Sequence, residues 1–147
     1  MNIRRGAFAL PILFLLLTVS SVSVFGQSDR QTVVNIPFNF IVGDKSLPAG
    51  QYVIQRNKRD SDTVWTITTK DSGVTRKLFL TVPVRSNDTQ QDTKLVFSRY
   101  EDYYFLTAFW TAGDNTGREL QRSDREKNLD QKLLAQREEV IVTSRGR

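Results

Sequence analysis

Acid–base chemistry by carboxylates, a Ser-Lys pair or hard-metal binding through oxygen ligands is the chemistry left to this chain, because the sequence contains neither histidine nor cysteine. A Ser-His-Asp triad, a thiolate nucleophile and a zinc site of the usual kind are therefore excluded. Two carboxylates on either side of a sugar linkage could still hydrolyse a polysaccharide. The candidates lie in or beside one aromatic-rich stretch and are Glu101, Asp102, Asp114 and Glu119. Their spacing singles out no catalytic pair, and we expect no catalytic residue, no metal and no cofactor.

The aromatic-rich stretch is also the strongest candidate for a binding site. Tyr100, Tyr103 and Phe109 would form an aromatic platform on one face of a hairpin, with Arg99 and Arg118 at its margin. Such a platform could bind a sugar ring, an apolar ligand or a partner protein. The alternative is that these rings belong to the core, because aromatic residues dominate small β cores.

Alternating apolar residues predict the strands that would position these groups. Every second residue from Val34 to Val42 is apolar, which is the period of a half-buried strand. Pro37 lies inside this run, so the strand is expected at a sheet edge or bent there. A second strand is expected to begin at Tyr52–Ile54.

A first hairpin is expected around the turn Asp71–Gly73, where glycine allows a positive φ. An even-length loop places Ile67 opposite Leu78 and Trp65 opposite Leu80. We predict this register because it puts both apolar pairs on one buried face.

A second hairpin is expected in the aromatic-rich stretch. Its closure pairs Phe97 with Leu106 and Leu95 with Ala108, and it puts Trp110 at the far end of the same face. The opposite face is apolar as well. A hairpin with two apolar faces is either central and covered, or it displays an aromatic surface.

A helix is expected over residues 124–137. Ser123 and Glu126 form a capping box, and acidic residues begin the helix while basic residues end it. The narrow apolar stripe of Leu129, Leu133 and Leu134 is expected to rest on the sheet. A last short strand is expected at Val140–Val142.

These elements predict an all-β fold, an antiparallel β-sandwich or small open barrel of about six or seven strands with one C-terminal helix. Residues 27–147 are expected to form this single domain, which has no disulfide to stabilise it. An outer-membrane barrel is disfavoured because too few long strands are available.

The first 26 residues have the pattern of a secretory signal peptide. Arg4 and Arg5 precede the apolar run Ala7–Leu17, and a small residue, Gly26, stands at the expected cleavage point. A membrane anchor is the alternative, and Pro11 disfavours it. We therefore expect a periplasmic or secreted protein with no membrane span after cleavage. The formal net charge of +5 is too small and too dispersed to indicate a nucleic-acid partner.

Two stretches, Val34–Tyr52 and Leu95–Leu120, carry a resemblance. The first contains the motif VGDK-LPAG-Y and the second the motif RY-D-YFL…W…GREL. Together they resemble a group of short, uncharacterised exported β-rich bacterial proteins. This resemblance implies an extracytoplasmic β protein and no particular chemistry.

The sequence therefore favours a non-catalytic binding or interaction module of the cell envelope, whose partner would be an envelope protein or a glycan. The alternative, from a different class, is a small carboxylate-dependent hydrolase that acts on envelope polysaccharide.

Overall fold

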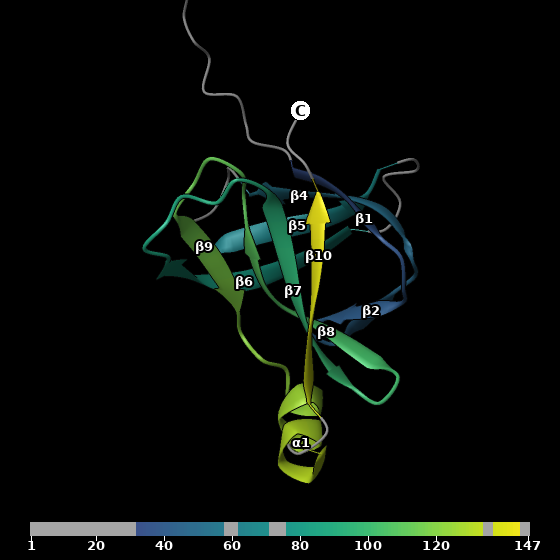
Figure 1. Ribbon diagram of the computed structural model, residues 1–147. Helices are drawn as coiled ribbons and strands as arrows, with labels where there is room; N and C mark the ends of the chain where they lie inside the picture. The colour runs from purple at the N-terminus through teal and green to yellow at the C-terminus, as the bar shows by residue number, and fades with distance from the viewer. Residues whose placement is uncertain (1–31, 58–61, 71–75, 134–136, 145–147) are drawn as a thin grey trace, which may run out of the picture.

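The computed structural model describes residues 32–57, 62–70, 76–133 and 137–144 (Figure 1). Within these residues the chain forms one helix and ten strands, and the ten strands belong to one open sheet. The strands are β1 (Thr32–Ile36), β2 (Phe40–Val42), β3 (Lys45–Leu47), β4 (Gly50–Arg56), β5 (Val64–Thr69), β6 (Arg76–Arg85), β7 (Thr93–Tyr100), β8 (Tyr103–Trp110), β9 (Thr116–Leu120) and β10 (Glu138–Ser144). The helix is α1 (Asp124–Leu133).

The expected β class is confirmed, but the expected number of strands is too small. Pro37 separates one expected strand into β1 and β2, since proline has no N–H to continue the ladder. The strands β3 and β9 were not expected, because their sequences KSL and TGREL show little apolar alternation. The predicted signal peptide lies outside the described residues. No helix in the described part of the chain has the length and apolar character that a membrane crossing requires.

The sheet runs in the order β1-β4-β5-β6-β9-β8, with β7 and then β10 on the other edge of β8. The edge of β8 that faces away from β7 pairs with β9 over one part of its length and with β2, of the short hairpin β2–β3, over another. There β2 pairs with β8 in parallel, with Ile41 opposite Phe105. The sheet is therefore mixed, and the expectation of a purely antiparallel sheet is wrong at this one place.

The predicted register of the first hairpin is wrong. Ile67 lies opposite Lys77, and Trp65 lies opposite Phe79. The buried face of β6 carries Phe79, which is 8% exposed, whereas Leu78 is 48% exposed. The large aromatic ring takes the core position, so the leucine face points outward and the register moves by one residue.

The second hairpin is predicted correctly only as far as its middle. Arg99 pairs with Tyr104 and Phe97 pairs with Leu106, as expected. Beyond this point the register shifts, and Leu95 lies opposite Phe109 instead of Ala108.

The sheet curves around a single large apolar core (Figure 1). The buried residues of this core are Val34, Ile36, Phe40, Val42, Leu47, Tyr52, Ile54, Ile67, Phe79, Leu95, Phe97, Leu106, Phe109 and Leu120. The alternation predicted for Val34 and Ile36 is confirmed, since both are buried between exposed neighbours. With no cysteine in the sequence, packing in this core must hold the sheet together.

The helix begins where the capping motif predicts. The backbone N–H of Glu126 donates to Ser123 Oγ at 3.2 Å, which caps the first turn. The described helix ends at Leu133, and residues 134–136 of the predicted span lie outside the described residues. The expected last strand is confirmed as β10, which pairs with β7 in antiparallel fashion.

Candidate functional site

A β-bulge in the β7–β8 hairpin decides which side chains leave the core. Two residues of β8, Thr107 and Ala108, occupy the space opposite Val96, where the register shifts. The Thr107 hydroxyl donates to the Val96 carbonyl oxygen at 3.0 Å. The extra residue shifts the alternation of inward and outward side chains along β8 by one position. As a result Phe109 is buried in the core and Trp110 lies on the outer face.

Side chains on the tip half of this outer face pack against α1, which lies below the ends of β7 and β10 in Figure 1. Leu129 and Leu133 of the helix pack against a second buried cluster of Ile41, Tyr100 and Phe105. This contact confirms that the helix rests on its own sheet through these two leucines.

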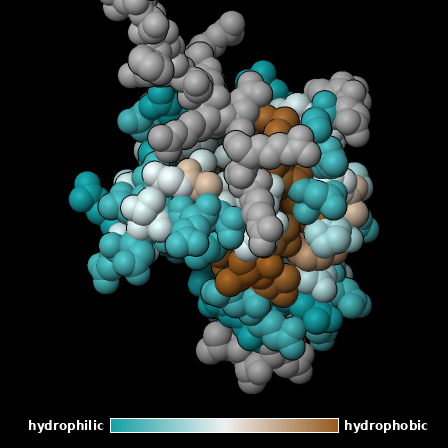
Figure 2. Space-filling view, turned by 45° about the horizontal axis from the view of Figure 1, so that its top comes forward, coloured by the Kyte–Doolittle hydropathy of each residue, from teal (hydrophilic) through white to brown (hydrophobic). Residues whose placement is uncertain are grey.

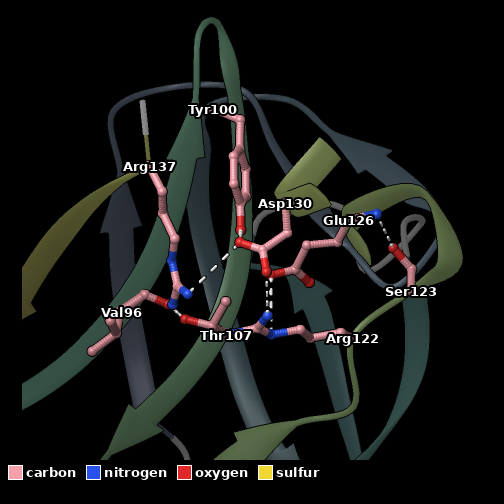
Figure 3. Close-up of polar contacts among 8 residues, drawn as sticks. All are labelled: Val96, Tyr100, Thr107, Arg122, Ser123, Glu126, Asp130 and Arg137. Carbon is pink, nitrogen blue, oxygen red and sulfur yellow. Dashed lines mark hydrogen bonds and ion pairs between the residues drawn. The ribbon is translucent and has the colours of Figure 1, made fainter. Parts of the chain in front are cut away.

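A polar network joins the helix to the hairpin (Figure 3). The Tyr100 hydroxyl donates to Asp130 Oδ1 at 2.6 Å, and Arg122 donates to Asp130 Oδ2 at 3.0 Å. Arg137 lies on the other side of the same carboxylate, at 3.8 Å. Asp130 of α1 therefore contacts Arg122, which precedes the helix, Arg137, which follows it, and Tyr100 of β7.

The network favours a charged Asp130. The hydrogen bond from Tyr100 lowers the pKa of this carboxyl, and attraction by Arg122 and Arg137 lowers it further against the effect of burial. Burial, followed by the hydrogen bond to Asp130, raises the pKa of Tyr100 to about 12. The phenol is therefore a permanent donor at neutral pH.

Glu126 has an unusual environment on the buried side of α1. Its side chain is 4% exposed, and Oε1 accepts no hydrogen bond within the described residues. The nearest cationic atom is Arg122 Nε, at 3.9 Å. Burial raises the pKa of this carboxyl above its ordinary value. The capping box is therefore only half formed, because the glutamate turns inward instead of reaching back to Ser123.

The other half of the outer face forms a groove of about 510 Å³, which we call the outer groove. Its apolar lining includes Val84, Val96, Ala108, Trp110 and Ile141. Its charged lining consists of Lys94, Glu119, Arg122, Arg137 and Glu139. In Figure 2 hydrophobic residues form a strip near the centre of the view, and hydrophilic residues lie on either side of it.

The strand register explains why these residues meet. Ile141 lies opposite Val96, Val96 opposite Ala108, and Ala108 opposite Glu119, so one row of side chains crosses four strands. The bulge brings Ala108 into this row. Sequence neighbours contribute little to the groove, because each strand supplies at most three of its side chains.

Trp110 forms one side of the groove and is held from behind by β9. A Cβ atom on Gly117 would lie 2.2 Å from Trp110 Nε1 and 2.3 Å from Cε2, so the indole lies directly against the glycine backbone. On its other side Trp110 pairs with Lys94 of β7. The indole Nε1 is buried and donates to no acceptor in the described part of the chain.

Three charged side chains of the outer groove have no polar partner among the described residues. They are Lys94, Glu119 and Glu139. Arg122 and Arg137 contact Asp130 but keep about a third of their side-chain surface exposed. The groove therefore offers free donors, free acceptors and an aromatic side chain within one concavity. This combination can bind a ligand, and within the described residues no cluster of acidic side chains is suited to a metal.

The predicted aromatic platform does not form. Tyr100 and Phe109 are 0% and 1% exposed and belong to different clusters, so the alternative interpretation that they are core residues is confirmed for both. Tyr103 is 40% exposed and carries the Arg125 guanidinium 4.7 Å above its ring. The two proposed aromatic neighbours of Tyr103 are thus unavailable to a ligand that binds there.

The two arginines that were predicted at the margin of the platform lie on different aromatic rings. Arg99 covers Tyr104 at 5.5 Å and pairs with Glu138 at 3.2 Å. Arg118 covers Trp65 at 5.6 Å. Neither lines the outer groove, and neither do the three predicted aromatic residues.

Of the four candidate carboxylates, Glu119 lines the groove and the others do not. Glu101 and Asp102 are exposed at the hairpin turn, where Glu101 has a φ of +52°. Asp114 Oδ1 accepts from the Thr116 N–H at 2.9 Å within a loop. The second groove carboxylate, Glu139, was missed because it precedes the expected strand Val140–Val142, whereas β10 begins at Glu138 and so places Glu139 on one face with Ile141.

Comparison with known proteins finds no matching family model, no matching curated protein and no matching solved structure.

Proposed function

We propose that this chain is an exported, non-catalytic binding module of the cell envelope, and that the outer groove is its binding site. The leader pattern of residues 1–26 supports export. The shape and lining of the groove support binding, because a preformed concavity with a few convergent polar groups is the usual form of a ligand site.

One observation carries this proposal. The bulge turns Trp110 away from a core rich in aromatic rings and into a groove where Lys94, Glu119 and Glu139 have no polar partner in the part of the chain that the structure describes. Trp110 is only partly buried there, so it gives up part of the stabilisation that full burial would supply, which is roughly 2–3 kcal/mol in total. A protein selected for stability alone would gain by burying the rest of this ring, so its partial exposure favours a role in binding.

The binding test compares two aromatic residues on the same hairpin. The processed chain, secreted from its full-length gene, is immobilised and incubated separately with envelope polysaccharide and with soluble envelope protein. We expect the wild-type chain and the Tyr103→Ala control to retain material from one fraction, and Trp110→Ala to lose it. Equal retention by all three chains, or none by the wild type, would contradict the proposal.

A carboxylate-dependent hydrolase is the second candidate, and one observation favours it. Glu119 and Glu139 line the same groove, and two carboxylates facing one ligand are what acid–base glycoside hydrolysis requires. If the chain is a hydrolase, it releases reducing ends from envelope polysaccharide, and Glu119→Gln and Glu139→Gln each abolish that release while binding persists. Binding without release by the wild type would remove this candidate.

A further inference from the structure

We propose that the ligand of the outer groove is an uncharged oligosaccharide, one sugar ring of which lies against Trp110 while its hydroxyls bridge Lys94 and the two carboxylates. This inference rests on the proposed function and names the ligand class for the same site.

The charge of the groove favours an uncharged ligand. Lys94, Arg122 and Arg137 line it together with Glu119 and Glu139, and both arginines already contact Asp130. The cationic and anionic charges therefore balance. A polyanion would be repelled by the carboxylates of Glu119 and Glu139, and a polycation would be repelled by Lys94 and the two arginines, so neither kind of charged ligand fits the whole groove.

Sugar hydroxyls match the unpartnered groups. Each hydroxyl both donates and accepts, so one sugar unit can donate to Glu119 or Glu139 and accept from Lys94 at the same time. Hydrogen bonds to charged groups are stronger than those between neutral groups. No charge on the ligand is needed to use all three side chains.

Trp110 provides the apolar contact that a sugar ring requires. A pyranose ring has a face of C–H groups, which packs on the face of an aromatic ring. Gly117 lies directly against the indole from β9, so the ring is supported before any ligand arrives. A supported ring loses little freedom on binding, which favours affinity.

The size of the groove fits a short oligosaccharide. A volume of about 510 Å³ lies within the range of small-molecule sites, roughly 300–1,000 Å³. The lining comes from five neighbouring strands, β6 to β10, so the groove is an open channel across the sheet and not a closed pocket for a single small molecule.

The test is a titration of the processed, secreted chain with two neutral probes, cellohexaose and hexa-N-acetylchitohexaose, and one anionic probe, hexagalacturonate. Calorimetry gives the affinity. Nuclear magnetic resonance follows the two indole N–H signals, because the chain contains only two tryptophans. We expect one neutral probe to bind, to shift the Trp110 signal more than the Trp65 signal, and to bind more tightly than the anionic probe.

Adjacent glutamates on β10 supply a matched control. Glu139 lines the groove, whereas Glu138 pairs with Arg99 outside it. We expect Glu139→Ala to weaken binding about tenfold, the loss of one charged hydrogen bond, and Glu138→Ala to leave it unchanged.

The ligand class is wrong if neither neutral probe binds, if the anionic probe binds more tightly, or if Glu138→Ala and Glu139→Ala weaken binding equally. Absence of oligosaccharide binding together with Trp110-dependent retention of envelope protein would contradict the ligand class alone. Absence of both would contradict the proposed function as well.

Discussion

The hydroxyl of Thr107 donates a 3.0 Å hydrogen bond to the carbonyl oxygen of Val96 at the bulge of the β7–β8 hairpin. At the bulge two residues of β8 lie opposite Val96, and the side chain of one of them, Thr107, bonds to its carbonyl oxygen. Without the extra residue, Phe109 and Trp110 would exchange faces. This hydrogen bond therefore stabilises the β-bulge that places Trp110 in the outer groove.

Substitution of Thr107 tests this role. Thr107→Val keeps the shape and the strand preference of the side chain but removes the hydroxyl. We expect the free energy of unfolding to fall by about 1 kcal/mol, measured by urea denaturation, and the Trp110 indole signal to shift. Thr107→Ser keeps the hydroxyl, so its free energy of unfolding should fall by less than that of Thr107→Val. Equal losses in the two variants would contradict a role for the hydrogen bond.

Gly117→Ala tests the support of the indole. The added Cβ would lie 2.2 Å from Trp110 Nε1, so the ring has to move. We expect a loss of about 1–3 kcal/mol in the free energy of unfolding and a displaced indole N–H signal. In a Trp110→Ala background the same change should cost much less, because the clash is gone. A cost that is equal in both backgrounds would show that the indole does not occupy this position.

Tyr100→Phe tests the link between α1 and the sheet. The variant keeps the buried ring and removes the donor to Asp130. A hydrogen bond to a charged group is worth about 1.5 kcal/mol or somewhat more, and we expect that loss in chemical denaturation. Tyr103→Phe is the control, because Tyr103 is exposed and should change stability by less than about 0.5 kcal/mol. Similar effects of the two substitutions would contradict the network.

Glu126→Gln tests the buried carboxyl through its pH dependence. The pKa of Glu126 is raised in the folded protein, so the folded state binds the proton more tightly than the unfolded state. Its protonated form stabilises the fold below the ordinary value of 4.5, and this stability is lost as the pH rises through the raised pKa.

The variant has no such titration. We therefore expect Glu126→Gln to be more stable than the wild type near neutral pH and equal to it in acid, as measured by urea denaturation across the pH range. Glu139→Gln, at an exposed position, should differ little from the wild type throughout. Destabilisation by Glu126→Gln at neutral pH would mean that attraction to Arg122 outweighs burial.

Short sequence signals, such as a proline, a capping serine or a short turn, predicted the local features of the fold. Pro37 indicated an edge or a bend in the first strand, although not its separation into β1 and β2, and Ser123 marked the start of α1. Arg99 and Tyr104 were paired correctly because the turn between them is short. These features depend on a few adjacent residues, which a sequence displays directly.

The outer groove could not be predicted in the same way. Its formation depends on an extra residue at Thr107, and threonine is common in strands with and without bulges. The predicted hairpin put Leu106 and Trp110 on one face, whereas the bulge separates them. The groove also needs β9, whose sequence TGREL has a single large apolar residue. Long-range pairing of five strands set the site, and local alternation does not encode that pairing.

The central claim is that the outer groove contacts an envelope component. A photoreactive benzoylphenylalanine at Ile141, which is 52% exposed in the groove, is compared with the same group at Leu78, which is 48% exposed and does not line it. In cells that express the chain, irradiation should give an envelope adduct from position 141 that Trp110→Ala abolishes, and no adduct from position 78. Equal adducts from both positions, or none from position 141, would contradict the claim.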